Sequence, residues 1–143
     1  MYKTILIATD GSDLATKAAK HGVSLAKALN AKIVALTVTE PFRWYDTNIV
    51  PGTVEAYVEG TKAFAAAALG TISGEARAQG VACETVHLEN ENPDQGIIDT
   101  ADGRGCDLIV MSSHGRRGIS AAVLGSVAHR VLAQSKIPVL IVR

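Results

Sequence analysis

Short apolar runs of strand length alternate along this chain with longer segments in which apolar residues recur at helical spacing. The strand-like runs are Lys3–Thr9, Lys32–Thr39, Val81–Leu88, Asp107–Met111 and Pro138–Val142. The helical segments fall at about residues 12–30, 54–79, 92–105 and 127–134. Strands that alternate with helices run parallel, because each helix returns the chain to the same edge of the sheet. We therefore predict an α/β fold with a single open five-stranded parallel sheet and helices on both faces.

The composition is that of one globular domain covering residues 1–143. The chain is 48% hydrophobic and 20% charged, and 14 basic residues balance 14 acidic residues. This balance argues against a protein that works by broad attraction to nucleic acid or to an anionic membrane surface. Two cysteines, Cys83 and Cys106, are too few for a disulfide framework and lack metal-ligand spacing.

The apolar runs are too short to cross a membrane, which takes about 20 residues. The sequence passes from Met1-Tyr2-Lys3 directly into the first strand-like run, without the apolar core or cleavage site of a signal peptide. We therefore expect a cytoplasmic protein.

Two features of the helical segments can be tested directly. Residues 92–95, Asn-Pro-Asp-Gln, have the N-cap, proline and glutamine pattern of a helix start. Gly60, Gly70 and Gly74 interrupt the long second helix, where each costs about 1 kcal/mol relative to alanine. We expect these glycines to allow close packing of that helix on the sheet.

The segment from Gly115 to Gly125, which we call the glycine loop, carries the clearest functional signal. Glycines permit positive φ angles and let the backbone approach a ligand closely. Ser126 is placed to cap the following helix, and the amides of Gly125, Ser126 and Val127 lie at its positive end. The pattern is typical of an anion site, most often for phosphate. An ordinary glycine-rich connector before a capped helix stays open as a second interpretation.

Arg116 and Arg117 add positive charge to the glycine loop. The loop is not a Walker A motif, because the chain has no Gly-Lys-Ser/Thr, and no Gly-x-Gly-x-x-Gly follows the first strand-like run. These absences argue against fast phosphoryl transfer through a P-loop lysine and against NAD.

Open parallel sheets bind ligands beyond the carboxyl ends of their strands. Asp10 follows the first strand-like run, and Val38 lies near the end of the second. A carboxylate at this place is suited to accept hydrogen bonds from ribose hydroxyl groups. It is equally suited to cap the first helix, for which Ser12 and Asp13 also qualify. Spacing alone leaves both interpretations of Asp10 open.

Residues 4–12, Thr-Ile-Leu-Ile-Ala-Thr-Asp-Gly-Ser, resemble the opening of universal stress proteins. Ser113–Val127 and Ile137–Val142 are similar to the signature and the last strand of that family. The resemblance covers the whole chain. It implies a Rossmann-like fold of the adenine nucleotide alpha hydrolase kind, with strand order 3-2-1-4-5.

The ATP-binding branch of that family is marked by Gly-x2-Gly-x9-Gly-Ser/Thr. Gly115, nine residues and then Gly125-Ser126 reproduce the larger half of this pattern. Ser112 replaces the first glycine and places a Cβ atom where the ribose and phosphates pass.

The resemblance implies that the protein binds ATP, with or without Mg²⁺. It implies that Asp10 faces the ribose and that the main chain of Val38 meets the adenine edge. The other residues of the implied site are Thr9, Met111, Ser112, His114, Gly115 and Arg116 around the nucleotide and Gly125, Ser126 and Val127 at the phosphates. Members of the family are usually homodimers joined through their last strands, which implies pairing through Val139–Val142, an apolar edge of the kind that proteins cover.

Three functions follow as hypotheses. The first is a small ATP-binding regulatory protein that responds to nucleotide without turning it over quickly. The second is a nucleotide-free dimeric interaction module of the same fold, motivated by Ser112. The third is a slow ATP hydrolase in which His114 or Asp10 assists a water molecule.

The sequence shows no nucleophile or orienting partner for His114, so we favour ligand contact or loop positioning for this residue. Phe42, Trp44 and Tyr45 lie in an aperiodic loop at residues 41–53. They suit either a lid or partner surface, or anchoring of that loop against the fold.

Overall fold

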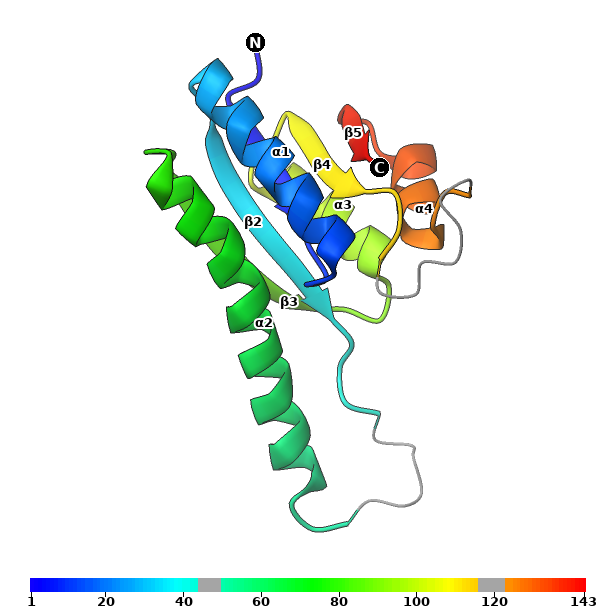
Figure 1. Ribbon diagram of the computed structural model, residues 1–143. Helices are drawn as coiled ribbons and strands as arrows, with labels where there is room; N and C mark the ends of the chain where they lie inside the picture. Colours follow the sequence, from blue (N-terminus) through cyan, green and yellow to red (C-terminus); the bar gives the residue numbers. More distant parts are fainter. Residues whose placement is uncertain (44–49, 116–122) are drawn as a thin grey trace.

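The computed structural model describes residues 1–43, 50–115 and 123–143, which form the predicted alternation of strands and helices (Figure 1). The elements are, in chain order, β1 (Thr4–Ala8), α1 (Asp13–Leu29), β2 (Lys32–Thr39), α2 (Thr53–Ala78), β3 (Cys83–Glu89), α3 (Pro93–Gly103), β4 (Leu108–Ser112), α4 (Ser126–Gln134) and β5 (Val139–Val142). Each boundary lies within two residues of its predicted place.

The strands form one five-stranded sheet in the order β3-β2-β1-β4-β5, and every pair is parallel. Strand β1 is central, since Ile5 pairs with Ile33 of β2 on one side and with Leu108 of β4 on the other. The chain first builds the sheet outward through β2 and β3 and then crosses to β4 and β5. The predicted fold class and strand order are confirmed. The reversal of strand order places the carboxyl ends of β1 and β4 side by side, where open sheets bind ligands.

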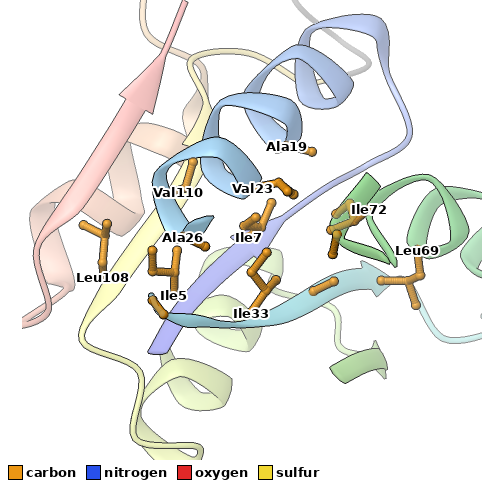
Figure 2. Packing of buried hydrophobic residues seen from close by; sticks show 13 residues of the cluster. Ile5, Ile7, Ala19, Val23, Ala26, Ile33, Leu69, Ile72, Leu108 and Val110 are labelled. Atoms are coloured by element: carbon orange, nitrogen blue, oxygen red, sulfur yellow. The ribbon is translucent and has the colours of Figure 1, made fainter. Parts of the chain in front are cut away.

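Helices cover both faces of the sheet, and each face has its own core. On one face α1 and α2 contribute Val23 and Ile72, which pack with Ile7 of β1 (Figure 2). On the other face α3 and α4 contribute Ile97 and Val131. All five residues of β1 are buried, because a central parallel strand with helices on both faces has no side that meets water.

The glycines of α2 do not serve the packing role that we expected. A Cβ atom built on Gly60, Gly70 or Gly74 would have no described heavy atom within 4 Å outside its own helix. These glycines therefore lie on the outer surface of α2, whose buried face is formed by alanines, leucine and isoleucine. The prediction failed because spacing identifies a glycine in a helix but not the face on which it lies.

Hydrogen bonds at the start of α3 also differ from the prediction. Pro93 occupies the first turn as expected, but within the described chain the side chain of Asn92 makes no capping hydrogen bond. Instead Asn90 Oδ1 accepts a hydrogen bond from the Asn92 amide at 2.8 Å. The segment before α3 is thus held by a turn that lies outside the helix.

The first half of α2 extends past the carboxyl end of β2 (Figure 1). Its residue Tyr57 donates a hydroxyl hydrogen bond to the main-chain carbonyl of Glu40. The ring of Phe42 packs edge-on against Tyr57, with ring centroids 5.5 Å apart. Phe42 therefore anchors the start of the 41–53 loop to α2, whereas Trp44 and Tyr45 lie outside the described residues.

The described helices include none that is both long enough and apolar enough to cross a membrane.

Candidate functional site

Thr9 closes the carboxyl end of β1 with main-chain and side-chain hydrogen bonds. Its amide donates to the Leu36 carbonyl at 2.9 Å, and its own carbonyl accepts from the Thr37 hydroxyl at 2.7 Å. The Thr9 hydroxyl oxygen accepts from the Gly11 amide at 3.1 Å. Thr9 is 8% exposed, and these hydrogen bonds fix the direction in which the chain leaves β1.

Asp10 follows in the turn between β1 and α1. Its Oδ1 accepts a hydrogen bond from the Ser12 amide at 3.0 Å. Ser12, and not Asp10, is the N-cap of α1, since its hydroxyl oxygen accepts from the Ala15 amide at 3.2 Å. The Oδ1 atom of Asp10 therefore braces the turn, at the place where β1 and β4 end side by side.

Gly115 lies directly against the second carboxylate oxygen of Asp10. A Cβ atom built on Gly115 would lie 2.4 Å from Asp10 Oδ2, closer than any real side chain approaches. The φ angle of Gly115 is not in the positive region, so this contact, and not the backbone conformation, disfavours a side chain here. The structure thus brings together two predicted site residues that are 105 positions apart in the sequence.

Ser112 ends β4, and its side chain is turned into its own loop. The Ser112 hydroxyl donates to the His114 carbonyl at 2.6 Å, and the residue is 8% exposed. Met111 before it is buried in the core on the α3 and α4 face. The Ser112 side chain therefore stabilises the turn after β4, and its hydroxyl group has a hydrogen-bond partner within the protein.

Ser113 connects three parts of the molecule and was not predicted as a site residue. Its amide donates to the Val142 carbonyl of β5 at 2.9 Å, and its carbonyl accepts from the Gly125 amide at 2.7 Å. Its hydroxyl lies 3.0 Å from Nδ1 of His114. The two main-chain bonds depend on tertiary structure, so the spacing of residues could not have predicted these contacts of Ser113.

The start of α4 differs from the prediction in two ways. Gly125 is the N-cap and Ser126 is the first helical residue, and among the described residues no side chain caps the helix. The Gly125 amide is already bonded to Ser113, so it is not available to a phosphate. This leaves the first-turn amides of Ser126 and Val127 at the positive end of the helix.

Gly125 is a glycine for a different reason from the one we expected. Its φ of −63° and ψ of 156° are extended backbone angles that any residue adopts. A Cβ atom at this position would lie 2.9 Å from the Ser113 carbonyl oxygen and 3.3 Å from Cα of His114. Gly125 therefore lets α4 begin directly against the end of β4.

The main chain of Val38 faces the end of β1. Its side chain packs on the α3 face, where a Cβ atom on Gly96 would come within 3.2 Å of it. Main-chain groups of alternate strand residues point the same way. The Leu36 carbonyl bonds to Thr9 on the β1 side, so the amide and carbonyl of Val38 also point toward β1, beyond the last paired residue of that strand.

The comparisons with known proteins agree with this architecture. The family model for the universal stress protein family matches residues 1–143. This chain belongs to the universal stress protein family. A universal stress protein of Methanocaldococcus jannaschii, MJ0531, is 37% identical over 145 residues, which cover all of this chain and 83% of that protein.

Solved universal stress proteins have the same fold. The structure of MJ0577, a universal stress protein of the same archaeon, superimposes with a TM-score of 0.80 at 28% identity and covers 99% of this chain and 96% of that chain. A universal stress protein solved in complex with cAMP gives a TM-score of 0.70 at 29% identity, covering 99% of this chain and 97% of that chain.

His114 of this universal stress protein is held by its neighbours in the loop. Its Nδ1 pairs with the Ser113 hydroxyl, and its Nε2 is buried without a hydrogen-bond partner among the described residues. Ser113 is 3% exposed and His114 is half-buried, so the histidine ring packs partly into the protein beside Ser113. The contact favours the loop-positioning interpretation of His114.

The remaining polar chemistry is limited in the part of the chain that the structure describes. No three His, Cys, Asp or Glu side chains gather there as they would around a metal ion. Cys106 is buried, and burial raises the pKa of its thiol to about 11. A protonated, enclosed thiol fits a structural role. Arg116 and Arg117 lie outside the described residues.

Proposed function

We propose that this universal stress protein is a small cytoplasmic regulatory protein that binds ATP where β1, β2 and β4 end. The contact between Asp10 and Gly115 carries the proposal. It sets a carboxylate against the first residue of the glycine loop, and the loop returns to the sheet at the first turn of α4. A ribose acceptor and a set of amide donors for phosphates thus lie at the two ends of one loop.

Each remaining residue has a role in this proposal. Asp10 accepts hydrogen bonds from the ribose, and the main chain of Val38 meets the adenine edge. The first-turn amides of Ser126 and Val127 bind phosphate oxygens, with charge from Arg116. The residues that shape the wall are Thr9, Met111, Ser112, His114, Gly115 and Gly125. A related structure with a bound cyclic adenine nucleotide supports an adenine nucleotide as the ligand.

Mg²⁺ would be held here mainly by the nucleotide. Asp10 is the only carboxylate within the described residues 4–12 and 108–115, which form the ends of β1 and β4. Hard cations prefer several oxygen ligands, so phosphate oxygens and water would complete the set. Asp10 therefore fits a metal bound together with nucleotide.

The direct test is to purify the protein, denature it and analyse the small molecules released. We expect ATP or AMP in the extract, and we expect calorimetry on the stripped protein to detect ATP binding. An extract without adenine nucleotide, together with no heat of binding, would defeat the proposal.

A second function, a nucleotide-free dimeric interaction module, is favoured by two observations. The Ser112 hydroxyl and the Gly125 amide are both satisfied inside the protein. The outer strand β5 is apolar and only half-buried, which suits pairing with a second copy through Val139–Val142. For such a module, Ser112→Gly should leave ATP affinity undetectable. A gain in ATP affinity would instead favour nucleotide binding as the function.

A further inference from the structure

We propose that Asp94, near the start of α3, is a positioning residue for the first turn of α4 and acts through Arg130. The role in ligand affinity rests on the proposed nucleotide function, because the first turn of α4 is where that proposal places the phosphates. The role in ordering α4 does not depend on any ligand.

Helix α4 needs support from outside itself. It has only nine residues, and helices of this length are unstable in isolation. Its N-cap is Gly125, and in the described structure no side chain satisfies its first amides. Only Ala128 and Val131 of this helix are buried. These residues, with the half-buried Val127 packed beside them, hold α4 on the sheet.

Asp94 is an unusual group at the boundary between α3 and α4. It is 6% exposed, and its Oδ1 is enclosed without a hydrogen-bond partner among the described residues. Burying a carboxylate is costly unless positive charge compensates it. The N-terminal end of α3 supplies part of that compensation, because Asp94 lies in the first turn of this helix.

Arg130 of α4, whose side chain is 58% exposed, adds positive charge on the other side. Its Nη1 lies 4.0 Å from Asp94 Oδ1, an ion-pair distance that is too long for a hydrogen bond. Arg130 follows Ser126 by four residues, so the two lie one turn apart on the same face of α4. Holding the guanidinium beside α3 therefore ties the N-terminal part of α4, which carries the amides of Ser126 and Val127, to α3.

The test compares Asp94→Asn with Asp102→Asn, an exposed acid of α3 whose substitution makes the same change in net charge. Displacement of a fluorescent ATP analogue gives the affinities for ATP and for adenosine, which has no phosphate. We expect Asp94→Asn to lower the affinity for ATP about three- to tenfold more than the affinity for adenosine. Asp102→Asn should leave the ratio of the two affinities unchanged. Arg130→Gln should lower the affinity for ATP to a similar extent. The double variant Asp94→Asn/Arg130→Gln should lose no more affinity for ATP than either single variant.

A second measurement needs no ligand. The His129 amide donates to the Gly125 carbonyl at 2.9 Å and closes the first turn of α4. We expect Asp94→Asn to speed hydrogen exchange at this amide about three- to tenfold without changing exchange in α1. If wild-type protein binds no ATP but His129 responds, the nucleotide proposal fails and the positioning of α4 stands. If ATP binds and Asp94→Asn changes neither the ATP-to-adenosine ratio nor His129 exchange, the positioning role is wrong.

Discussion

Gly115 and Asp10 lie so close that a single methyl group on Gly115 would reach to 2.4 Å from the Asp10 carboxylate. The carboxylate is the more mobile partner, because it is the end of a side chain. Its other oxygen is bonded to the Ser12 amide, so its movement would also disturb the turn before α1.

Gly115→Ala should therefore displace the Asp10 carboxylate and leave the fold intact. We expect ATP affinity to fall about ten- to hundredfold, the cost of losing a hydrogen bond to a charged group. Calorimetry measures the affinity, and thermal unfolding checks the fold. Gly103→Ala is the matched control, because a Cβ at the end of α3 meets no described atom within 4 Å. Equal affinity in the two variants would remove Asp10 from the site.

Gly125→Ala should reduce both stability and affinity. The new Cβ would press on the Ser113 carbonyl, which is backbone and cannot swing away. Overpacking of this kind costs about 1–3 kcal/mol, and relief requires the start of α4 to move. Urea unfolding and ATP titration of one preparation measure the two effects. A variant that keeps wild-type stability would show that the start of α4 does not pack against the Ser113 carbonyl.

Gly60→Ala and Gly74→Ala should stabilise the protein. Both positions face open space on α2, and alanine gains about 0.5–1 kcal/mol over glycine in a helix interior. The sites are far apart along the helix, so the gains should add. Gly96→Ala in α3 is the opposite case, since its Cβ would meet Leu88 at 3.1 Å and should destabilise. Urea unfolding measures whether each of the three variants is more or less stable than the wild type.

Stability should also fall at alkaline pH because of Cys106. Burial raises its pKa from 9.0 to about 11, so the folded protein keeps a proton that the unfolded chain loses. The contribution is complete below pH 9 and is lost as the pH rises through 11. Cys106→Ala should flatten the decline in the free energy of unfolding over this interval. If the free energy of unfolding falls equally with pH in the variant and in the wild type, Cys106 is not the cause of the decline.

Periodicity predicted the fold because it samples many residues at once. The buried run of β1 and the spacing of small and apolar residues along α1 both reflect which side faces the core, and each averages over several positions. Ser12 was among the predicted caps because a cap depends on residues next to it in the chain.

The site was less predictable because its contacts join distant segments. Gly115 was identified as part of a loop, but its contact with Asp10 has no local signature. Gly125 was assigned a backbone role, whereas its neighbour Ser113 is what excludes a side chain. The same limit hid Ser113, whose amide is bonded to Val142, 29 positions later.

The bonds of Ser113 have a mechanical consequence for this sheet. The last carbonyl of β5 holds its amide, and its own carbonyl holds the cap of α4. A strand that docked along the outside of β5 would therefore pull on a chain of two hydrogen bonds that ends at Gly125. If a second chain pairs with β5, these two hydrogen bonds of Ser113 connect that pairing to the start of α4, the shortest of the described helices.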